Sequence, residues 1–153
     1  MADNQITTSA APPSDVRLDS SYDQVPYSVS AFPQTRPDLL ASIATLFGMT
    51  PRDPNRCRVL ELGCASGGNV IPMAIASPGS QFVGIDLSSR QISDGKAVVD
   101  ALKLPNVDLR HLSITDLGDE WGQFDYILCH GVYSWVPPEV QEKVLAICRA
   151  NLS

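Results

Sequence analysis

Apolar positions follow a helical spacing soon after residue 35. With Thr35 as a candidate N-cap and with Pro37 and Asp38 in the first turn, the pattern predicts one amphipathic helix that ends at Gly48. The apolar positions of this helix are Leu39, Leu40, Ile43, Leu46 and Phe47.

Beyond residue 56, short apolar runs alternate with helical patterns. The runs predict buried strands at 58–63, 81–86, 107–112 and 124–129. The helical patterns fall at about 69–76, about 89–102 and in a segment that opens with Pro137 and Pro138. Alternating strands and helices predict an α/β fold with a parallel sheet. Ligands of such sheets bind at the carboxyl ends of the strands, so we expect the site in the loops after Leu62, Ile85 and Leu128.

The first 36 residues differ in amino-acid composition from the rest of the chain. They are rich in proline, serine, threonine and aspartate, and we interpret residues 1–20 as a disordered arm. Tyr22, Tyr27 and Phe32 are out of place in a pure linker because aromatic rings seek a surface to cover. We therefore expect residues 21–56 to form a lid and a helix that fold back onto a domain at 57–153.

The length, charge and cysteine content of the chain exclude several classes of protein. A chain of 153 residues with 44% hydrophobic residues allows one domain at most. It has no apolar stretch that could cross a membrane and no signal-peptide pattern, so we expect a cytoplasmic protein. The net charge of -6 disfavours a nucleic-acid partner. The spacing of Cys57, Cys64, Cys129 and Cys148 matches no zinc motif, so we predict no metal site.

The segment VLELGCASGGN at 59–69 predicts a turn between a strand and a helix. Gly63, Ala65 and Gly67 are small, so backbone amides there can approach a ligand, and the next helix directs its positive end at the same place. Tight packing of a helix on a strand requires small residues as well. The loop alone therefore leaves a binding role and a packing role open.

Asp86 ends the next predicted strand, 19 positions after Gly67. At this distance a carboxylate meets the ribose hydroxyls of an adenosine cofactor. The alternative is that Asp86 caps the following helix, but Ser88 and Ser89 can fill that place themselves. We favour ribose binding.

Two cofactor classes fit these positions. Gly63, Ala65 and Gly68 nearly satisfy the dinucleotide pattern G-x-G-x-x-G. Glu61, at the buried end of the first strand, favours S-adenosylmethionine (SAM) instead. A carboxylate there can order the loop and, through water, the ammonium of an amino-acid cofactor.

Five separated motifs resemble one bacterial family. They are YDQVPY (22–27), FPQT-x-PD (32–38), LELGCASGGN (60–69), GIDLS-x-RQI (84–92) and FDYI-x-CHGVYSWVP (124–137). Members of this family carry a class I SAM-dependent methyltransferase domain followed by a methyltransferase regulatory domain. They include protein-lysine methyltransferases that act on a rickettsial outer-membrane protein. The resemblance runs from about Ser21 to Leu152, and it departs from the family at Arg36, where a histidine is usual.

The resemblance implies a role for each matching residue. Gly63, Ala65 and Gly67 would contact the methionine portion of SAM, and Asp86 would hold the ribose. The remaining implied cofactor-binding residues are Glu61, Asn69, Leu87, Ser113, Ile114, Asp116, Cys129 and His130, of which Ser113, Ile114 and Asp116 would lie beside the adenine. Cys129, His130 and Gly131 would border the methyl group.

Methyl transfer from a sulfonium is an in-line displacement, so the protein mainly holds the reactants in position and excludes water. His130 and Tyr133 are the candidates for orienting an acceptor such as a lysine amine, although a lone histidine at a strand end is often only structural. Tyr22, Tyr27, Tyr133 and Trp135 would form an aromatic lid over a cation or would pack the arm onto the domain.

The resemblance also implies a Rossmann-like sheet with the strand order 3-2-1-4. The methyltransferase core has three more strands, so we expect this chain to be a truncated piece with the fourth strand at an exposed edge. A missing C-terminal part or a partner chain would cover that edge. The hypotheses at this point are a SAM-dependent methyltransferase, possibly of protein lysines, an NAD-dependent oxidoreductase, and an inactive SAM-binding fragment.

Overall fold

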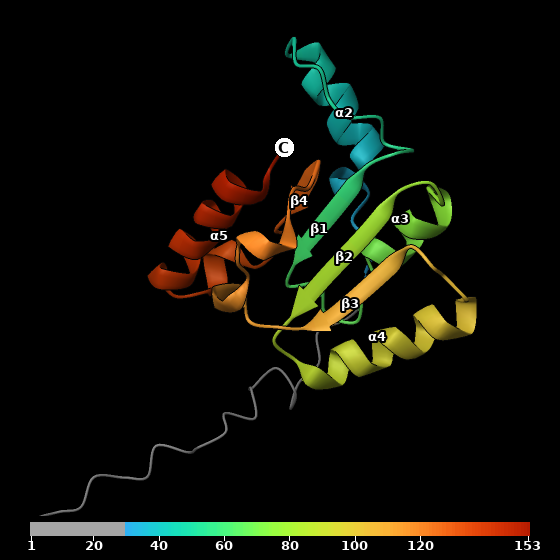
Figure 1. The fold of residues 1–153 in the computed structure, drawn as a ribbon, viewed down its shortest axis with the longest axis vertical. Coiled ribbons are helices and arrows are strands. Elements are labelled where there is room, and N and C mark those ends of the chain that lie inside the picture. Colours follow the sequence, from blue (N-terminus) through green and yellow to red (C-terminus); the bar gives the residue numbers. More distant parts are fainter. Residues whose placement is uncertain (1–29) are drawn as a thin grey trace, which may run out of the picture.

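A computed structural model describes residues 30–153, and its centre is a four-stranded parallel sheet (Figure 1). The strands are β1 (Arg58–Leu62), β2 (Gln81–Asp86), β3 (Val107–His111) and β4 (Tyr126–Leu128). Their order is β3-β2-β1-β4, with Leu60 of β1 opposite Val83 on one side and Ile127 on the other. The predicted parallel sheet and its strand order are confirmed.

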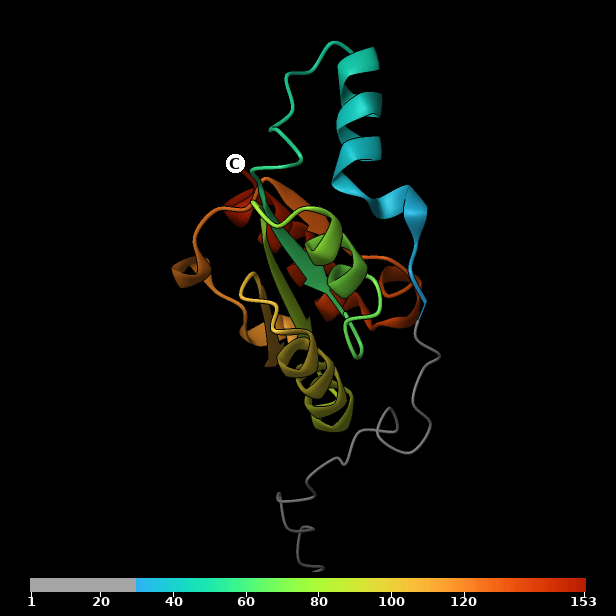
Figure 2. The same cartoon turned by 90° about the vertical axis from the view of Figure 1, so that its right-hand side faces the viewer.

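Helices cover both faces of this sheet. The longer ones are α2 (Pro37–Leu46), α3 (Val70–Ala76), α4 (Ser89–Leu102) and α5 (Pro138–Asn151). Figure 2 shows α3 and α4 in front of the sheet and α5 behind it. Side chains alternate along β1, so that Val59 packs in the core on the α3 side while Leu60 and Leu62 pack in the core on the α5 side. This alternation places Glu61 on the α3 side.

Short 3-10 turns fill several connections. They are η1 (Pro33–Thr35), η2 (Ile114–Asp116), η3 (Asp119–Trp121) and η4 (Tyr133–Trp135). The prediction that Thr35 caps α2 is wrong, because Arg36 is the N-cap and Thr35 lies buried in η1, where its hydroxyl donates to the Phe32 carbonyl. The predicted fourth strand at 124–129 is also shorter, since the regular ladder to β1 covers only Tyr126–Leu128.

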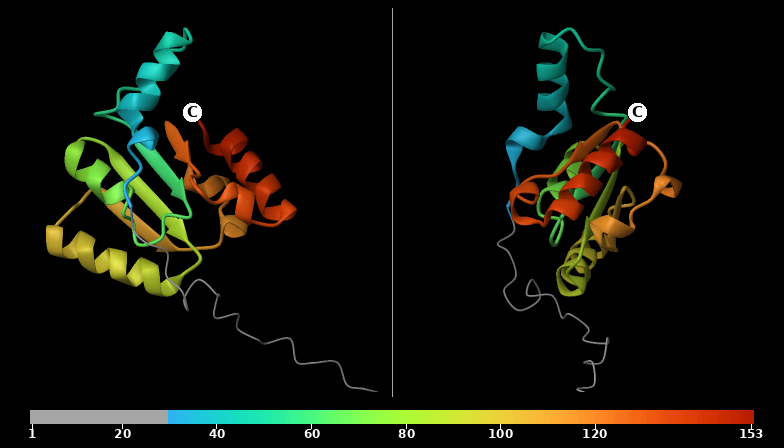
Figure 3. Two further views of the ribbon diagram at one scale, coloured as in Figure 1. Left: turned by 180° about the vertical axis from the view of Figure 1, so that it is seen from behind. Right: turned by 90° about the vertical axis from the view of Figure 1, so that its left-hand side faces the viewer.

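Helix α2 extends away from the sheet (Figure 3). It forms where the apolar spacing predicts it, but within the described chain its apolar residues stay largely uncovered. Leu46 is 86% exposed and Phe47, which follows the helix, is 82% exposed. Among the residues of α2, only Pro37 and Ala41 are buried by residues 30–153. No helix in this part of the chain combines the length and the apolar composition that crossing a bilayer requires.

Strand β4 forms one edge of the described sheet, as expected. Its outer side is partly occupied at the start, where Leu152 forms a parallel bridge with Phe124 and the Ser153 amide donates to the Phe124 carbonyl. The contact lies just before β4, so Tyr126–Leu128 keep β1 as their one strand partner within residues 30–153.

Candidate functional site

The loop between β1 and α3 has an unusual backbone. Gly63, Ala65 and Gly67 all adopt positive φ angles of 76°, 51° and 78°. The amides of Gly63 and Cys64 donate to the Ile85 carbonyl at 2.9 and 3.0 Å, which fixes the loop to the end of β2. The left-handed conformation is costly at Ala65 because a side chain is present there. The loop thus keeps a strained shape at the carboxyl edge, where ligands of parallel sheets bind.

Small residues in this loop also serve packing. A Cβ placed on Gly63 would lie 2.5 Å from Val132 Cγ2, which comes from the loop after β4. A Cβ on Gly67 would lie 3.1 Å from Leu109 and 3.2 Å from Ile71. Packing thus leaves little room for a side chain at either position. Only Gly67 fits the predicted packing of a helix on a strand, because its neighbours are Ile71 of α3 and Leu109 of β3. Packing does not exclude a ligand against the backbone atoms of either glycine.

Glu61 is the most unusual buried group of this region. The residue is 3% exposed, and its Oε1 accepts a hydrogen bond from Asn69 Nδ2 at 2.7 Å. Within residues 30–153 its Oε2 is buried and has no hydrogen-bond partner. Burial raises the pKa of this carboxyl to about 7, the bond from Asn69 opposes that rise, and the nearby charge of Asp86 adds to it. A buried carboxylate oxygen without a donor is what a cationic ligand group would complete.

Asn69 connects Glu61 to the segment before α2. Its Oδ1 accepts from the Phe32 amide at 2.9 Å, and its Nδ2 also lies 3.0 Å from Thr35 Oγ1. Sequence reasoning missed Thr35 as part of the site. The two residues are 34 positions apart, and no local pattern links them.

Asp86 lies at the end of β2, facing the loop after β1. Its Oδ2 accepts from the Ala65 amide and its Oδ1 from the Ser88 amide, both at 2.8 Å. Ser88 is the N-cap of α4, because its hydroxyl accepts from the Gln91 amide at 3.2 Å. The expectation that serine rather than Asp86 caps this helix is confirmed. Each carboxylate oxygen of Asp86 keeps a further lone pair for a hydroxyl donor.

The remaining residues predicted near the adenine and ribose lie at the same edge. Leu87 is 48% exposed, and its carbonyl lies 3.0 Å from His111 Nε2. Ser113 caps η2 by accepting from the Thr115 amide, and Ile114 packs partly into the core on the α5 side. Asp116 is exposed and its Oδ1 accepts from the Thr115 hydroxyl at 3.3 Å.

The loop after β4 carries the residues predicted near the methyl group. The ring of His130 lies 4.1 Å from the ring of Phe32, with an interplanar angle of 46°. Burial raises the pKa of the Cys129 thiol, so this thiol stays protonated at neutral pH. Gly131 has a positive φ of 70° with open space around its Cα.

The aromatic lid is not assembled within the described chain. Tyr133 and Trp135 lie in η4 and are 40% and 77% exposed, and the ring contact in this region joins Phe32 to His130 instead. Tyr22, Tyr27 and the arm at 1–20 lie outside the described residues.

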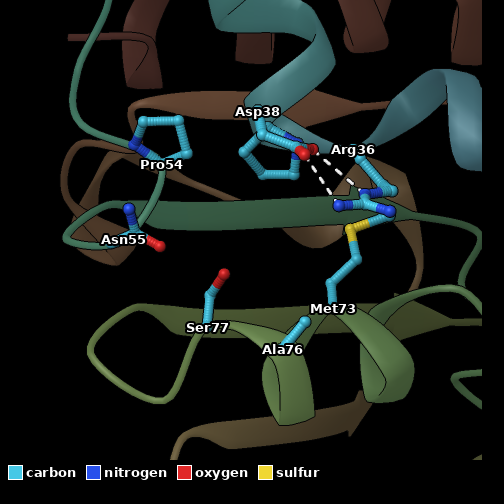
Figure 4. Close-up of a pocket in the computed structure, with 8 residues that line it drawn as sticks. Arg36, Asp38, Pro54, Asn55, Met73, Ala76 and Ser77 are labelled. Carbon is cyan, nitrogen blue, oxygen red and sulfur yellow. Dashed lines mark hydrogen bonds and ion pairs between the residues drawn. The ribbon is translucent and has the colours of Figure 1, made fainter.

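A cavity of about 160 Å³ lies elsewhere (Figure 4). It is bounded by the start of α2, the segment before β1 and the end of α3, and the Arg36–Asp38 ion pair of 2.7 Å stands at its rim. None of the predicted cofactor-binding residues lines this cavity. Within residues 30–153, His, Cys, Asp and Glu side chains form no cluster that could hold a metal ion.

The sequence from residue 60 to residue 153 matches a known family, that of the methyltransferase domain. The chain belongs to this methyltransferase domain family. The resemblance to class I SAM-dependent methyltransferases is thereby confirmed. The family also decides between the two cofactor classes that the glycine pattern left open, in favour of SAM.

Relatives of this methyltransferase domain include two uncharacterised proteins of Rickettsia prowazekii, RP789 and RP028. They are 48% and 46% identical to it over 86% and 87% of this chain, and the matched part is 24% and 53% of their own lengths. Among solved structures, PKMT2 from Rickettsia typhi in complex with AdoHcy superposes with a TM-score of 0.81 and 44% identity, over 84% of this chain and 25% of PKMT2. The chain thus spans between a quarter and about half of the length of these relatives.

Proposed function

We propose that this methyltransferase domain binds SAM at the carboxyl edge of β1, β2 and β4, and that the whole protein transfers the methyl group to a protein lysine. The observation that carries the proposal is Glu61, whose Oε2 is buried at this edge with no donor among residues 30–153. The ammonium of an amino-acid cofactor supplies the missing donor and the compensating charge. The AdoHcy complex of PKMT2 supports the same ligand class.

The other contacts follow from the loop geometry. In this proposal the backbone of Gly63, Ala65 and Gly67 surrounds the methionine portion, and the free lone pairs of Asp86 accept from the ribose hydroxyls. Leu87 offers an exposed apolar surface to the adenine. Ser113, Ile114 and Asp116 border the adenine from η2.

The chemistry needs little from the protein beyond positioning. When bound, SAM would supply an electrophilic methyl group on a sulfonium: the amine nitrogen would bond to the methyl carbon as the bond from that carbon to sulfur breaks, and the neutral thioether AdoHcy would leave with the bonding electron pair. A lysine amine has an ordinary pKa of about 10.4, so the site must favour its neutral form by excluding water. His130 and Tyr133, from the loop after β4, orient the amine in this proposal, and Cys129 and Gly131 line its approach.

Protein is a better acceptor class than nucleic acid for this chain. Its net charge of -6 repels a phosphate backbone and attracts a segment rich in lysine. The relation to PKMT2, a protein-lysine methyltransferase, supports this acceptor class.

Titration calorimetry of the 153-residue chain with SAM, AdoHcy and NAD tests the cofactor part of the proposal. We expect saturable heat with SAM and AdoHcy and none with NAD. Binding of NAD but not SAM would contradict it. The acceptor part is tested in the full-length protein with a radiolabelled methyl donor and lysine-containing peptides, against peptides in which every lysine is replaced by arginine.

A further inference from the structure

Residues 32–35 form a turn, here called the strap, that contacts two of the three loops of the site. The Phe32 amide donates to Asn69 Oδ1 beside the loop after β1, and the Phe32 ring contacts His130 in the loop after β4. The Thr35 hydroxyl donates to the Phe32 carbonyl at 2.8 Å, which closes the turn on itself. The strap therefore spans the part of the carboxyl edge where we place the methionine portion of the cofactor.

The Asn69 amide can have only one orientation in this network. The Phe32 amide is a donor, so the atom facing it must be Oδ1, and Nδ2 then directs its two hydrogens to Thr35 Oγ1 and Glu61 Oε1. A flipped amide would place Oδ1 against the Glu61 carboxylate and Nδ2 against another N–H group. Two partners from the strap thus hold the group that orients Glu61.

We propose that Thr35 and Asn69 are positioning residues that couple closure of the strap to the Glu61 carboxylate and thereby to cofactor binding. The link from Glu61 to cofactor binding rests on the proposed function, whereas the coupling between the strap and Glu61 does not. When the strap is in place, Asn69 holds Glu61 Oε1 and leaves Oε2 as the free acceptor for a cationic ligand. When the strap leaves, Asn69 loses two of its three partners and Glu61 is no longer oriented.

The coupling is reciprocal, as linkage requires. An ionised carboxylate accepts a stronger hydrogen bond from Asn69 than a neutral one does. A ligand that keeps Glu61 ionised therefore tightens Asn69, and through it the amide and hydroxyl bonds of the strap. In the free protein, raising the pH ionises Glu61 and should strengthen the hydrogen bonds of Asn69 and the strap in the same way.

Other titratable groups face this network. Asp86 lies near Glu61 from β2, and the thiols of Cys64 and Cys129 face it from the loops after β1 and β4. Burial raises the pKa of both thiols, so they stay protonated near neutral pH. His130 contacts the strap directly and needs a control of its own.

The first test uses SAM affinity in a double-mutant cycle. Thr35→Val removes the hydroxyl at nearly constant volume, and we expect three- to tenfold weaker SAM binding, restored by Thr35→Ser. In a Glu61→Gln background the same substitution should change affinity less than twofold. Thr45→Val is the matched control, because the Thr45 hydroxyl donates to the Ala41 carbonyl within α2 and, among residues 30–153, takes no part in the network around Glu61. A Thr35→Val effect equal to that of Thr45→Val, or unchanged by Glu61→Gln, would overturn the proposal.

The second test needs no cofactor. Hydrogen exchange of the Phe32 amide, corrected for its intrinsic rate, is followed by NMR from pH 5.5 to 8.5 in the free chain. Protection should rise several-fold through about pH 7, where Glu61 ionises, and this rise should vanish in Glu61→Gln and persist in His130→Gln. Flat protection in the unsubstituted chain refutes the coupling. If the rise is present but SAM does not bind, the coupling stands and the proposed function fails.

Discussion

Polar groups at the two ends of the sheet differ in how fully their hydrogen bonds are satisfied. At the amino end, Cys57, Ser80 and Asn106 each stand directly before a strand. Ser80 Oγ accepts from the Cys57 amide and donates to the Pro54 carbonyl. The side-chain nitrogen Nδ2 of Asn106 donates to three backbone carbonyls, those of Ala74, Ser77 and Ser80.

At the carboxyl end, one oxygen of the buried Glu61 carboxyl accepts a hydrogen bond, and the other has no donor in the part of the chain that the structure describes. Ser80 and Glu61 lie at opposite ends of the same sheet and are similarly buried, at 1% and 3% exposure, and Asn106 is partly buried. Groups at the amino end complete one another and stabilise the fold, whereas the carboxyl end keeps an acceptor that the described chain does not satisfy. Under the proposed function, this difference separates polar groups that serve folding from a group that binds the cofactor.

Glu61→Gln should give the largest effect by removing the charge at the carboxyl end. We expect SAM affinity to fall on the order of 100-fold, since the charge-assisted bond to the ammonium is replaced by a neutral one. Calorimetry of both chains measures it. An affinity within threefold of the unsubstituted chain would contradict the role of Glu61.

The same substitution should stabilise the free chain at high pH. The folded pKa of about 7 lies above the ordinary 4.5, so the stability that Glu61 contributes is present below pH 4.5 and is lost as the pH rises to about 7. Glu61→Gln avoids that loss, so it should be more stable by about 3 kcal/mol at pH 8 and by little at pH 4.5. Urea denaturation at both pH values checks the sign. Equal differences at the two would refute it.

Gly63→Ala and Gly131→Ala compare two glycines of similar backbone, with φ angles of 76° and 70°. Both substitutions pay the cost of a left-handed alanine, about 1 kcal/mol. Only Gly63→Ala adds the clash with Val132, so it should lose about 2 kcal/mol or more in total. Thermal unfolding of the pair measures the excess, and equal losses would show that Val132 yields freely.

Ser80→Ala should give the smallest effect and should act on stability alone. Removing the hydroxyl leaves the Cys57 amide and the Pro54 carbonyl without this partner, which costs about 1 kcal/mol. SAM affinity should stay within twofold of the unsubstituted value at a temperature where the chain is folded. A large loss of affinity would break the division between the two ends.

The sequence carried enough information for the elements near the site but not for the contacts between them. The apolar runs predicted four strands, and the parallel sheet predicted that the loops at the carboxyl ends of the strands form the site. The hydrogen bond from the Ala65 amide to Asp86 joins the loop after β1 to the end of β2. The spacing from Gly67 to Asp86 predicted ribose binding, which stays a prediction. The strand order came from the family resemblance, because apolar runs carry no record of their neighbours. Role assignments of the individual site residues stay predictions.

Local patterns failed where a distant partner decided the outcome. Thr35 fits the N-cap pattern of α2, but its bonds to Phe32 and Asn69 draw it into the strap. The apolar spacing of α2 predicted the helix correctly, yet spacing does not tell what a helix packs against, and Leu46 remains exposed.

The contact between Val132 and Gly63 has an evolutionary consequence. One methyl group of Val132 occupies the place where a Gly63 side chain would stand, so the two residues share a single volume. Enlarging position 63 while Val132 is present carries the cost of the clash, whereas a smaller residue at position 132 removes that clash beforehand. Sequences that diverge at these two positions should therefore tend to change as a pair, with position 132 becoming smaller first.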